Sequence, residues 1–119
     1  MKKELPLFSL RYGLTGRLLE RAGRFPKGLR PTLGIRLIER ALDVLETVVK
    51  LQYTRERRLL FQEVNLALER LRILLRLYLE RRLLSTGEYE EFAREVDTAG
   101  RMLGGWIRHA GEPAEEAGA

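Results

Sequence analysis

Histidine and paired carboxylates are the side chains of this sequence that could carry out chemistry. His109 is the only histidine among the 119 residues, and cysteine is absent. Glu39 with Asp43, and Glu91 with Glu95, are acids spaced four apart, a spacing that places two carboxylates on one helical face. Arginines lie within a turn of both pairs, so we interpret the acids as solvated, ion-paired surface residues. Near the chain end, His109 fits a contact with a helix C-terminus better than a catalytic role. We predict no enzyme, no cofactor and no metal site.

Arginine is the chemically distinctive residue of the chain. Arginine outnumbers lysine by eighteen to four, and the net charge is +5. Residues 1–40 carry ten basic and three acidic side chains, residues 41–111 carry twelve and eleven, and residues 112–119 carry three acids only. A guanidinium forms forked hydrogen bonds with phosphate or carboxylate. This excess favours a polyanionic partner, although basic helical proteins without such a partner also exist.

The candidate binding residues fall on the first predicted helix, on or beside the loop that follows it, and on the polar face of the third helix. They are Arg17, Arg21, Arg24, Lys27, Arg30, Arg36, Arg58, Arg72 and Arg76. For any one of them, a solvated surface role is the alternative. If these residues gather into patches, and an oligomer repeats the patches, they could bind a phosphate backbone with an affinity that depends strongly on salt. Aromatic residues fall mostly on apolar faces, so stacking on unpaired bases has little support.

The elements that must position these residues are four helices. Apolar residues recur at steps of three and four over about residues 7–23, 32–53, 55–84 and 86–109. Thr32 is the expected N-cap of the second helix, Ser85 and Glu88 form a capping box for the fourth, and Gly111 is its expected end. Short connections then predict an all-α, antiparallel up-down four-helix bundle over residues 1–111. Residues 112–119 are predicted to be a disordered acidic tail.

The third helix carries one apolar stripe too many for a single small core. Its first stripe alternates steps of four and three, as the seam of a bundle does. A second stripe lies about 100° away and is separated from the first by Glu63, Arg70 and Arg81. The second stripe consists of Leu59, Leu66, Ile73, Leu77 and Leu84. Either a thick helix touches two neighbours, or these residues form a subunit interface, which we favour because 119 residues supply few neighbours.

The sequence shows no candidate membrane span. Its longest charge-free stretches are Leu5–Leu10 and Met102–Ile107, far shorter than a bilayer requires. Glu4 and Arg11 interrupt what could otherwise begin a signal peptide. With no cysteine present, a reducing cytoplasm suits the chain, and we expect no membrane association.

Three segments together resemble the accessory variability determinant (Avd) proteins of diversity-generating retroelements. Residues 25–36, FPKGLRPTLGIR, are similar to that family's F-P-K-x-x-R-aromatic-T-L-G-x-R segment, with Pro31 in place of the aromatic. Residues 65–76 are similar to its N-x-x-L-x-x-L-R-x-x-x-R segment, and residues 100–106 to its G-R-M-L-G-G-W segment. The resemblance covers about residues 18–108, whereas residues 1–16 match only loosely.

The resemblance implies a four-helix bundle that assembles as a ring-like homopentamer with a basic surface around a central channel. It further implies association with the element's reverse transcriptase and its template RNA, with DNA as a further candidate ligand. The chain would then support mutagenic cDNA synthesis without a catalytic centre or a small-molecule substrate of its own.

Two alternatives remain at this point. One is the related four-helix-bundle family encoded in ribosomal RNA intervening sequences, whose usual N-I-A-E-G segment we do not find here. The other is a homo-oligomeric adaptor that binds neither reverse transcriptase nor nucleic acid.

Overall fold

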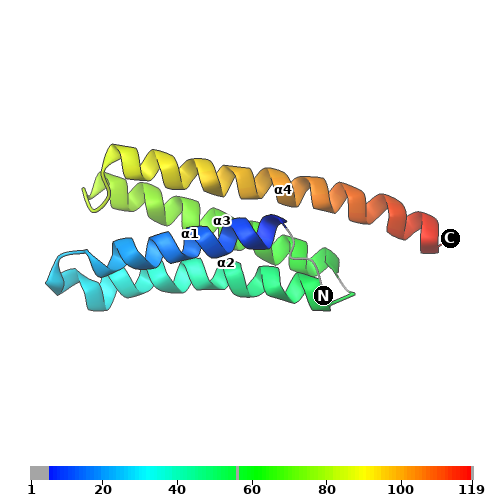
Figure 1. The fold of residues 1–119 in the computed structure, drawn as a ribbon, viewed down its shortest axis with the longest axis horizontal. Coiled ribbons are helices and arrows are strands. Elements are labelled where there is room, and N and C mark those ends of the chain that lie inside the picture. Colours follow the sequence, from blue (N-terminus) through cyan, green and yellow to red (C-terminus); the bar gives the residue numbers. More distant parts are fainter. Residues whose placement is uncertain (1–5, 56, 119) are drawn as a thin grey trace.

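Four helices account for most of the chain in a computed structural model of this protein (Figure 1). The structure describes the backbone of residues 6–55 and 57–118, and the side chains of residues 12–51, 53–55 and 57–105. The helices are α1 (Pro6–Gly23), α2 (Ile35–Tyr53), α3 (Arg57–Glu80) and α4 (Thr86–Gly118). A short 3-10 turn (Lys27–Leu29) and a π-helical turn (Arg30–Gly34) lead into α2. The described backbone contains no β-strand, so the prediction of an all-α chain is confirmed.

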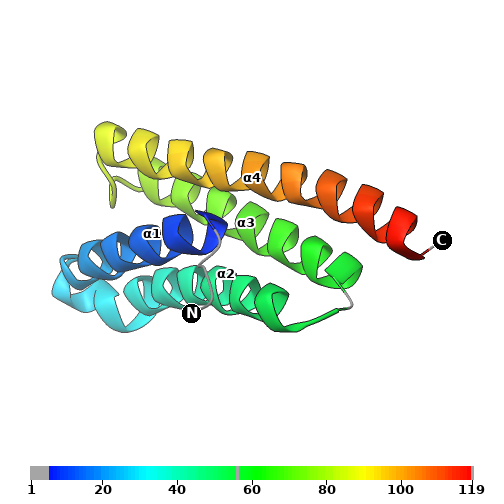
Figure 2. The same cartoon turned by 45° about the vertical axis from the view of Figure 1, so that its right-hand side comes forward.

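Successive helices pack against one another, and α1 also packs against α4 (Figures 1 and 2). Their apolar faces form one core, which buries Leu14 and Leu18 of α1, Leu37 and Val48 of α2, and the equivalent faces of α3 and α4. The helical spacing in the sequence predicts these buried positions correctly, because residues three and four apart share a helical face.

The fourth helix begins with the predicted capping box. The Ser85 backbone N–H donates to Glu88 Oε1 over 2.8 Å, and the Glu88 N–H donates to Ser85 Oγ over 3.1 Å. Each side chain therefore satisfies a backbone group that the first turn of a helix leaves without an intrahelical partner. The predicted end at Gly111 is not observed, because the described backbone is helical through Gly118.

The start of the second helix differs from the prediction. Thr32 is not the N-cap: it lies inside the π-helical turn, and its hydroxyl donates to the Leu29 carbonyl over 3.3 Å. Pro31 is the second residue of this turn. The N–H groups at the start of a helix have no intrahelical acceptor, so proline removes no helical hydrogen bond there. The chain is therefore already helical before α2 begins at Ile35.

The third helix ends four residues earlier than the spacing predicts, at Glu80. Arg82 has a φ of 63°, in the left-handed region. The Arg82 N–H donates to the Leu79 carbonyl over 3.0 Å, and the Leu83 N–H donates to the Tyr78 carbonyl over 2.8 Å. This pair of bonds is the Schellman motif, which satisfies carbonyls at a helix C-terminus and turns the chain away. Apolar periodicity continues through this turn, which is why spacing alone overestimates the length of α3.

Candidate nucleic-acid and subunit interfaces

Two connections lie together at one end of the molecule, and we call this end the loop end. They are the α1–α2 connection (residues 24–34) and the α3–α4 connection (residues 81–85), both seen at the left of Figure 1. Contacts of the α1–α2 connection with the last turn of α3, which leads into the α3–α4 connection, hold the two connections close together. The Phe25 ring packs edge-on against Tyr78 with 5.6 Å between ring centroids, and the Tyr78 hydroxyl donates to the Leu33 carbonyl over 2.7 Å. Burial raises the pKa of the Tyr78 hydroxyl, against the opposing effect of the Arg36 charge, so the phenol remains a donor at neutral pH.

Arg21 joins the two connections. Its Nε donates to Glu88 Oε2 over 2.7 Å, its Nη2 donates to the Leu83 carbonyl over 2.8 Å, and its guanidinium carbon lies 5.4 Å from the centre of the Phe25 ring. The side chain is only 19% exposed. These contacts use two of the five N–H donors of the guanidinium and leave little of the side chain exposed, so Arg21 positions the loop end and is poorly available to a ligand.

The structure divides the nine predicted binding residues into two groups. Five of them form ion pairs: Arg17 with Glu95, Arg21 with Glu88, Arg36 with Glu39, Arg72 with Glu69 and Asp97, and Arg76 with Glu80. The other four form no ion pair with a described residue, and all four are exposed: Arg24, Lys27, Arg30 and Arg58. A paired cation on a surface has less charge to offer a polyanion, so the second group holds the stronger candidates.

Arg81 and Arg82 extend the unpaired group, and the residue-by-residue prediction missed them as binding residues. Both are exposed, and neither forms an ion pair with a described residue. They lie in the α3–α4 connection, which the sequence predicts to be part of a continuous third helix. A signal was available, since residues 81–87 contain two arginines and no acid. We name the exposed cations of the two connections the basic loop end: Arg24, Lys27, Arg30, Arg81 and Arg82.

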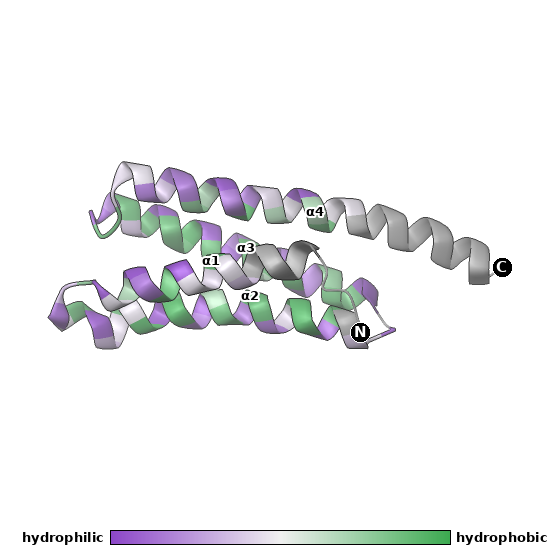
Figure 3. Ribbon diagram, viewed as in Figure 1, coloured by the Kyte–Doolittle hydropathy of each residue, from purple (hydrophilic) through white to green (hydrophobic). Residues whose placement is uncertain are grey.

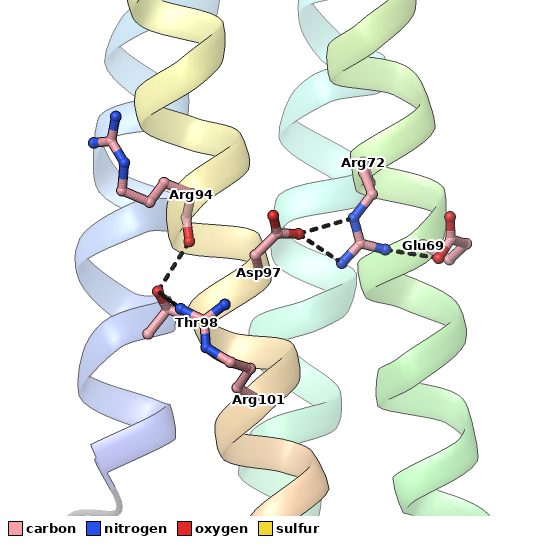
Figure 4. A network of polar contacts seen from close by, with 6 residues as sticks. All are labelled: Glu69, Arg72, Arg94, Asp97, Thr98 and Arg101. Atoms are coloured by element: carbon pink, nitrogen blue, oxygen red, sulfur yellow. Dashed lines mark hydrogen bonds and ion pairs between the residues drawn. The ribbon is translucent and has the colours of Figure 1, made fainter.

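The polar face of α3 is closer to neutral than the sequence predicts. Arg72 lies between two carboxylates, with Nη1 2.6 Å from Glu69 Oε2 and Nη2 3.2 Å from Asp97 Oδ1 of α4 (Figure 4). Arg101 donates to the Thr98 hydroxyl over 3.2 Å, and Arg72 and Arg101 line a shallow groove between α3 and α4. Because two acids balance Arg72, this network is better suited to holding α3 against α4 than to attracting an anion.

Four apolar residues of the predicted subunit interface are exposed on α3. Leu59 is 66% exposed, Leu66 51%, Ile73 62% and Leu77 43%. Steps of seven, seven and four keep them on one side of the helix, and we name them the α3 apolar row. Leu84 does not belong with them: it is 3% exposed in the core, because α3 ends at Glu80 and the chain turns inward before Leu84. Its inclusion in the predicted interface is therefore wrong.

Two further predictions concern residues beyond the described side chains. His109 lies there, as does the last part of the 100–106 segment. Among the described residues, no group of three or more His, Cys, Asp or Glu side chains could hold a metal ion. Within the same part of the chain, every helix is too short or too polar to cross a membrane.

Comparison with known protein families identified a match over most of the chain. The bAvd-like family matches residues 12–110 of this chain. Neither the curated proteins nor the solved structures contain a match. The matched range includes both the basic loop end and the α3 apolar row.

Proposed function

This chain belongs to the bAvd-like family, and we propose that it is the non-catalytic accessory subunit of a diversity-generating retroelement. In this role it binds the element's reverse transcriptase and template RNA in the cytoplasm and supports mutagenic cDNA synthesis. The observation that carries the proposal is that an exposed apolar row and a separate group of unpaired cations lie on one small chain.

The α3 apolar row supports self-association. A water-soluble monomer rarely exposes four large apolar residues in line on one helix, since covering them with a partner removes apolar surface from water. We propose that the helices form an up-down bundle and that copies of it assemble through this row into a ring-like homopentamer. The contacts of α1 with α4 and of each helix with the next support the bundle.

The unpaired cations support the second half of the proposal. Within one chain they are few, but a symmetric oligomer repeats them and strengthens the field that an RNA or an acidic polymerase surface meets. Arginine is well suited to both partners, because its forked donors fit phosphate and carboxylate equally.

Co-purification tests this function. The tagged full-length chain is expressed with the reverse transcriptase and template RNA of its own element, and the tag is used to recover complexes. We expect both partners to be recovered, and nuclease treatment then separates RNA-mediated from direct binding to the polymerase. Recovery of the chain as an oligomer without either partner would instead support the adaptor alternative and overturn the proposal.

A further inference from the structure

We propose that the basic loop end binds the phosphate backbone of a double-stranded nucleic acid, such as the stem of an RNA hairpin. The inference deepens the proposed function and rests on it, because it names the part of the RNA that the chain contacts and the surface that contacts it.

Charge is more one-sided at the loop end than the net charge of the chain indicates. The two connections, residues 24–34 and 81–85, contain five basic residues and no acidic one. Arg21 and Arg36 beside them are paired with Glu88 and Glu39, but none of the five cations of the basic loop end forms an ion pair with a described residue. Phosphate is the natural partner of such a group, because binding it releases condensed counterions.

The cations are carried by a rigid platform. The Arg30 Nε donates to the Phe25 carbonyl over 2.8 Å, and the Leu29 N–H donates to the Pro26 carbonyl over 2.8 Å, so the α1–α2 connection is internally bonded. Arg21 of α1 donates to the Leu83 carbonyl of the α3–α4 connection, and Tyr78 at the end of α3 donates to the Leu33 carbonyl of the α1–α2 connection. The backbone that carries the cations is therefore ordered before a ligand arrives, which lowers the entropic cost of binding.

Arg82 occupies a position that favours glycine. Its φ of 63° is strained for a residue with a Cβ, and the corresponding position of a Schellman motif is usually glycine. The exposed side chain forms no ion pair with a described residue. A strained residue whose charge meets no acid among the described residues is a reason to look for an external ligand.

The placement of aromatic residues argues for the backbone of a duplex over unpaired bases. Phe25 and Tyr78, the aromatic residues in the core of this end, are 0% and 1% exposed. The described aromatic residues that are strongly exposed are Tyr12 and Tyr53, and Tyr53 ends α2 at the opposite end of the molecule (Figure 2). Unpaired bases are held mainly by stacking on exposed rings, whereas a duplex presents its phosphates outward.

Figure 3 shows hydrophilic residues in both connections of the loop end.

Cations outside the loop end supply a matched control. Lys50 and Arg55 at the opposite end, and Arg94 on α4, are exposed and form no ion pair with a described residue. Replacing all three with glutamate changes the charge of the chain by as much as Arg24→Glu, Lys27→Glu and Arg81→Glu do together. Any difference between the two triple variants therefore reports position and not total charge.

Fluorescence anisotropy with the full-length chain and a labelled RNA hairpin of about 16 base pairs tests the inference. We expect the loop-end triple variant to bind at least ~10-fold more weakly than the wild type at low salt, and its affinity to depend less on salt concentration. The control triple variant should lose much less affinity. A DNA duplex should compete with the hairpin, because both present a phosphate backbone, and an unpaired oligonucleotide of equal charge should compete poorly.

Two results would overturn the inference: equal losses in the two triple variants, or tighter binding of the unpaired oligonucleotide. Arg82→Gly guards against misfolding as an explanation, because glycine suits the backbone at this position. This variant should lose RNA affinity while remaining folded by circular dichroism; unchanged affinity would remove Arg82 from the site. If the loop-end variants bind RNA normally but wild-type complexes still contain the reverse transcriptase and RNA, the proposed function stands and only this site is wrong.

Discussion

Glu88 takes part in two interactions that hold the start of α4. Its carboxylate accepts the Ser85 backbone N–H and the Nε of Arg21, which comes from α1. Partial burial alone would raise the pKa of Glu88, but the hydrogen bonds from Ser85 and Arg21 outweigh it and lower the pKa below its usual value of 4.5. One carboxylate thus caps a helix and anchors the arginine that joins both connections.

This lowered pKa predicts a pH dependence of stability. Because the folded state holds Glu88 in its charged form more strongly than the unfolded state, the resulting stabilisation is present above the unfolded pKa and is lost as pH falls through the folded pKa. The wild type should therefore lose more unfolding free energy than Glu88→Gln when the pH is lowered from about 6 to about 3. Urea unfolding of both proteins at the two pH values measures the difference. Parallel losses would show that the ion pair contributes no net stability.

The contacts of each residue, and not its type, decide which cations are available to a ligand. The sequence places Arg21 and Arg24 on one helical face, yet Arg21 is largely covered by Glu88, Leu83 and Phe25, while Arg24 is exposed. The same side-chain type therefore has a structural role at one position and a candidate binding role one turn later.

At the level of elements, the ends of the helices differ most from the predictions. The capping box of α4 was predicted correctly because its two residues lie three apart and bond each other's backbone. The end of α3 was not, because Arg82 takes a conformation that is uncommon for arginine and no local sequence signal announces it.

Replacing Arg82 with glycine should stabilise the protein. Glycine adopts a positive φ without the steric cost that a Cβ brings, and this gain should exceed the added entropy of the unfolded chain, for a net increase of about 0.5 kcal/mol or more. Chemical unfolding of Arg82→Gly and of the neighbouring control Arg81→Gly would measure it. Arg81→Gly should not be stabilising, since the positive φ belongs to Arg82. A lower stability of Arg82→Gly would mean that the arginine side chain makes a stabilising contact.

At the level of the whole molecule, the α3 apolar row is the surface that the proposed assembly would cover. Leu66 and Ile73 are half exposed or more in the single chain, so polar replacements there should leave the fold of that chain nearly unchanged. The same positions would be covered in an oligomer.

We expect Leu66→Glu with Ile73→Glu to convert an oligomer into a monomer of 13.8 kDa, because burying two carboxylates in an apolar interface is strongly unfavourable. Light scattering coupled to size-exclusion chromatography measures the mass. Arg58→Gln with Asn65→Glu changes the charge by the same amount at two exposed positions on the polar face of α3; this matched control should remain oligomeric. A wild-type chain that is already monomeric at micromolar concentration would contradict the proposed assembly.

The sequence by itself determined the number of helices, their buried faces and the start of α4. These features depend on residues within one or two helical turns, so spacing of three and four and a capping box are sufficient to predict them. The α3 apolar row was also visible, because Leu59, Leu66, Ile73 and Leu77 share the face of one continuous helix.

Only the tertiary structure decided which cations are paired and where Leu84 lies. Arg17 meets Glu95, 78 residues away, and Arg21 meets Glu88, 67 residues away, and both pairs depend on how α1 docks against α4. Leu84 is buried because the chain turns at Arg82. The prediction placed Leu84 with the exposed row because it assumed that the third helix continues to residue 84. The spacing of residues along one helix carries no information about partners that packing brings together. The basic loop end could therefore not be predicted, because it combines residues of two connections that are far apart in the sequence.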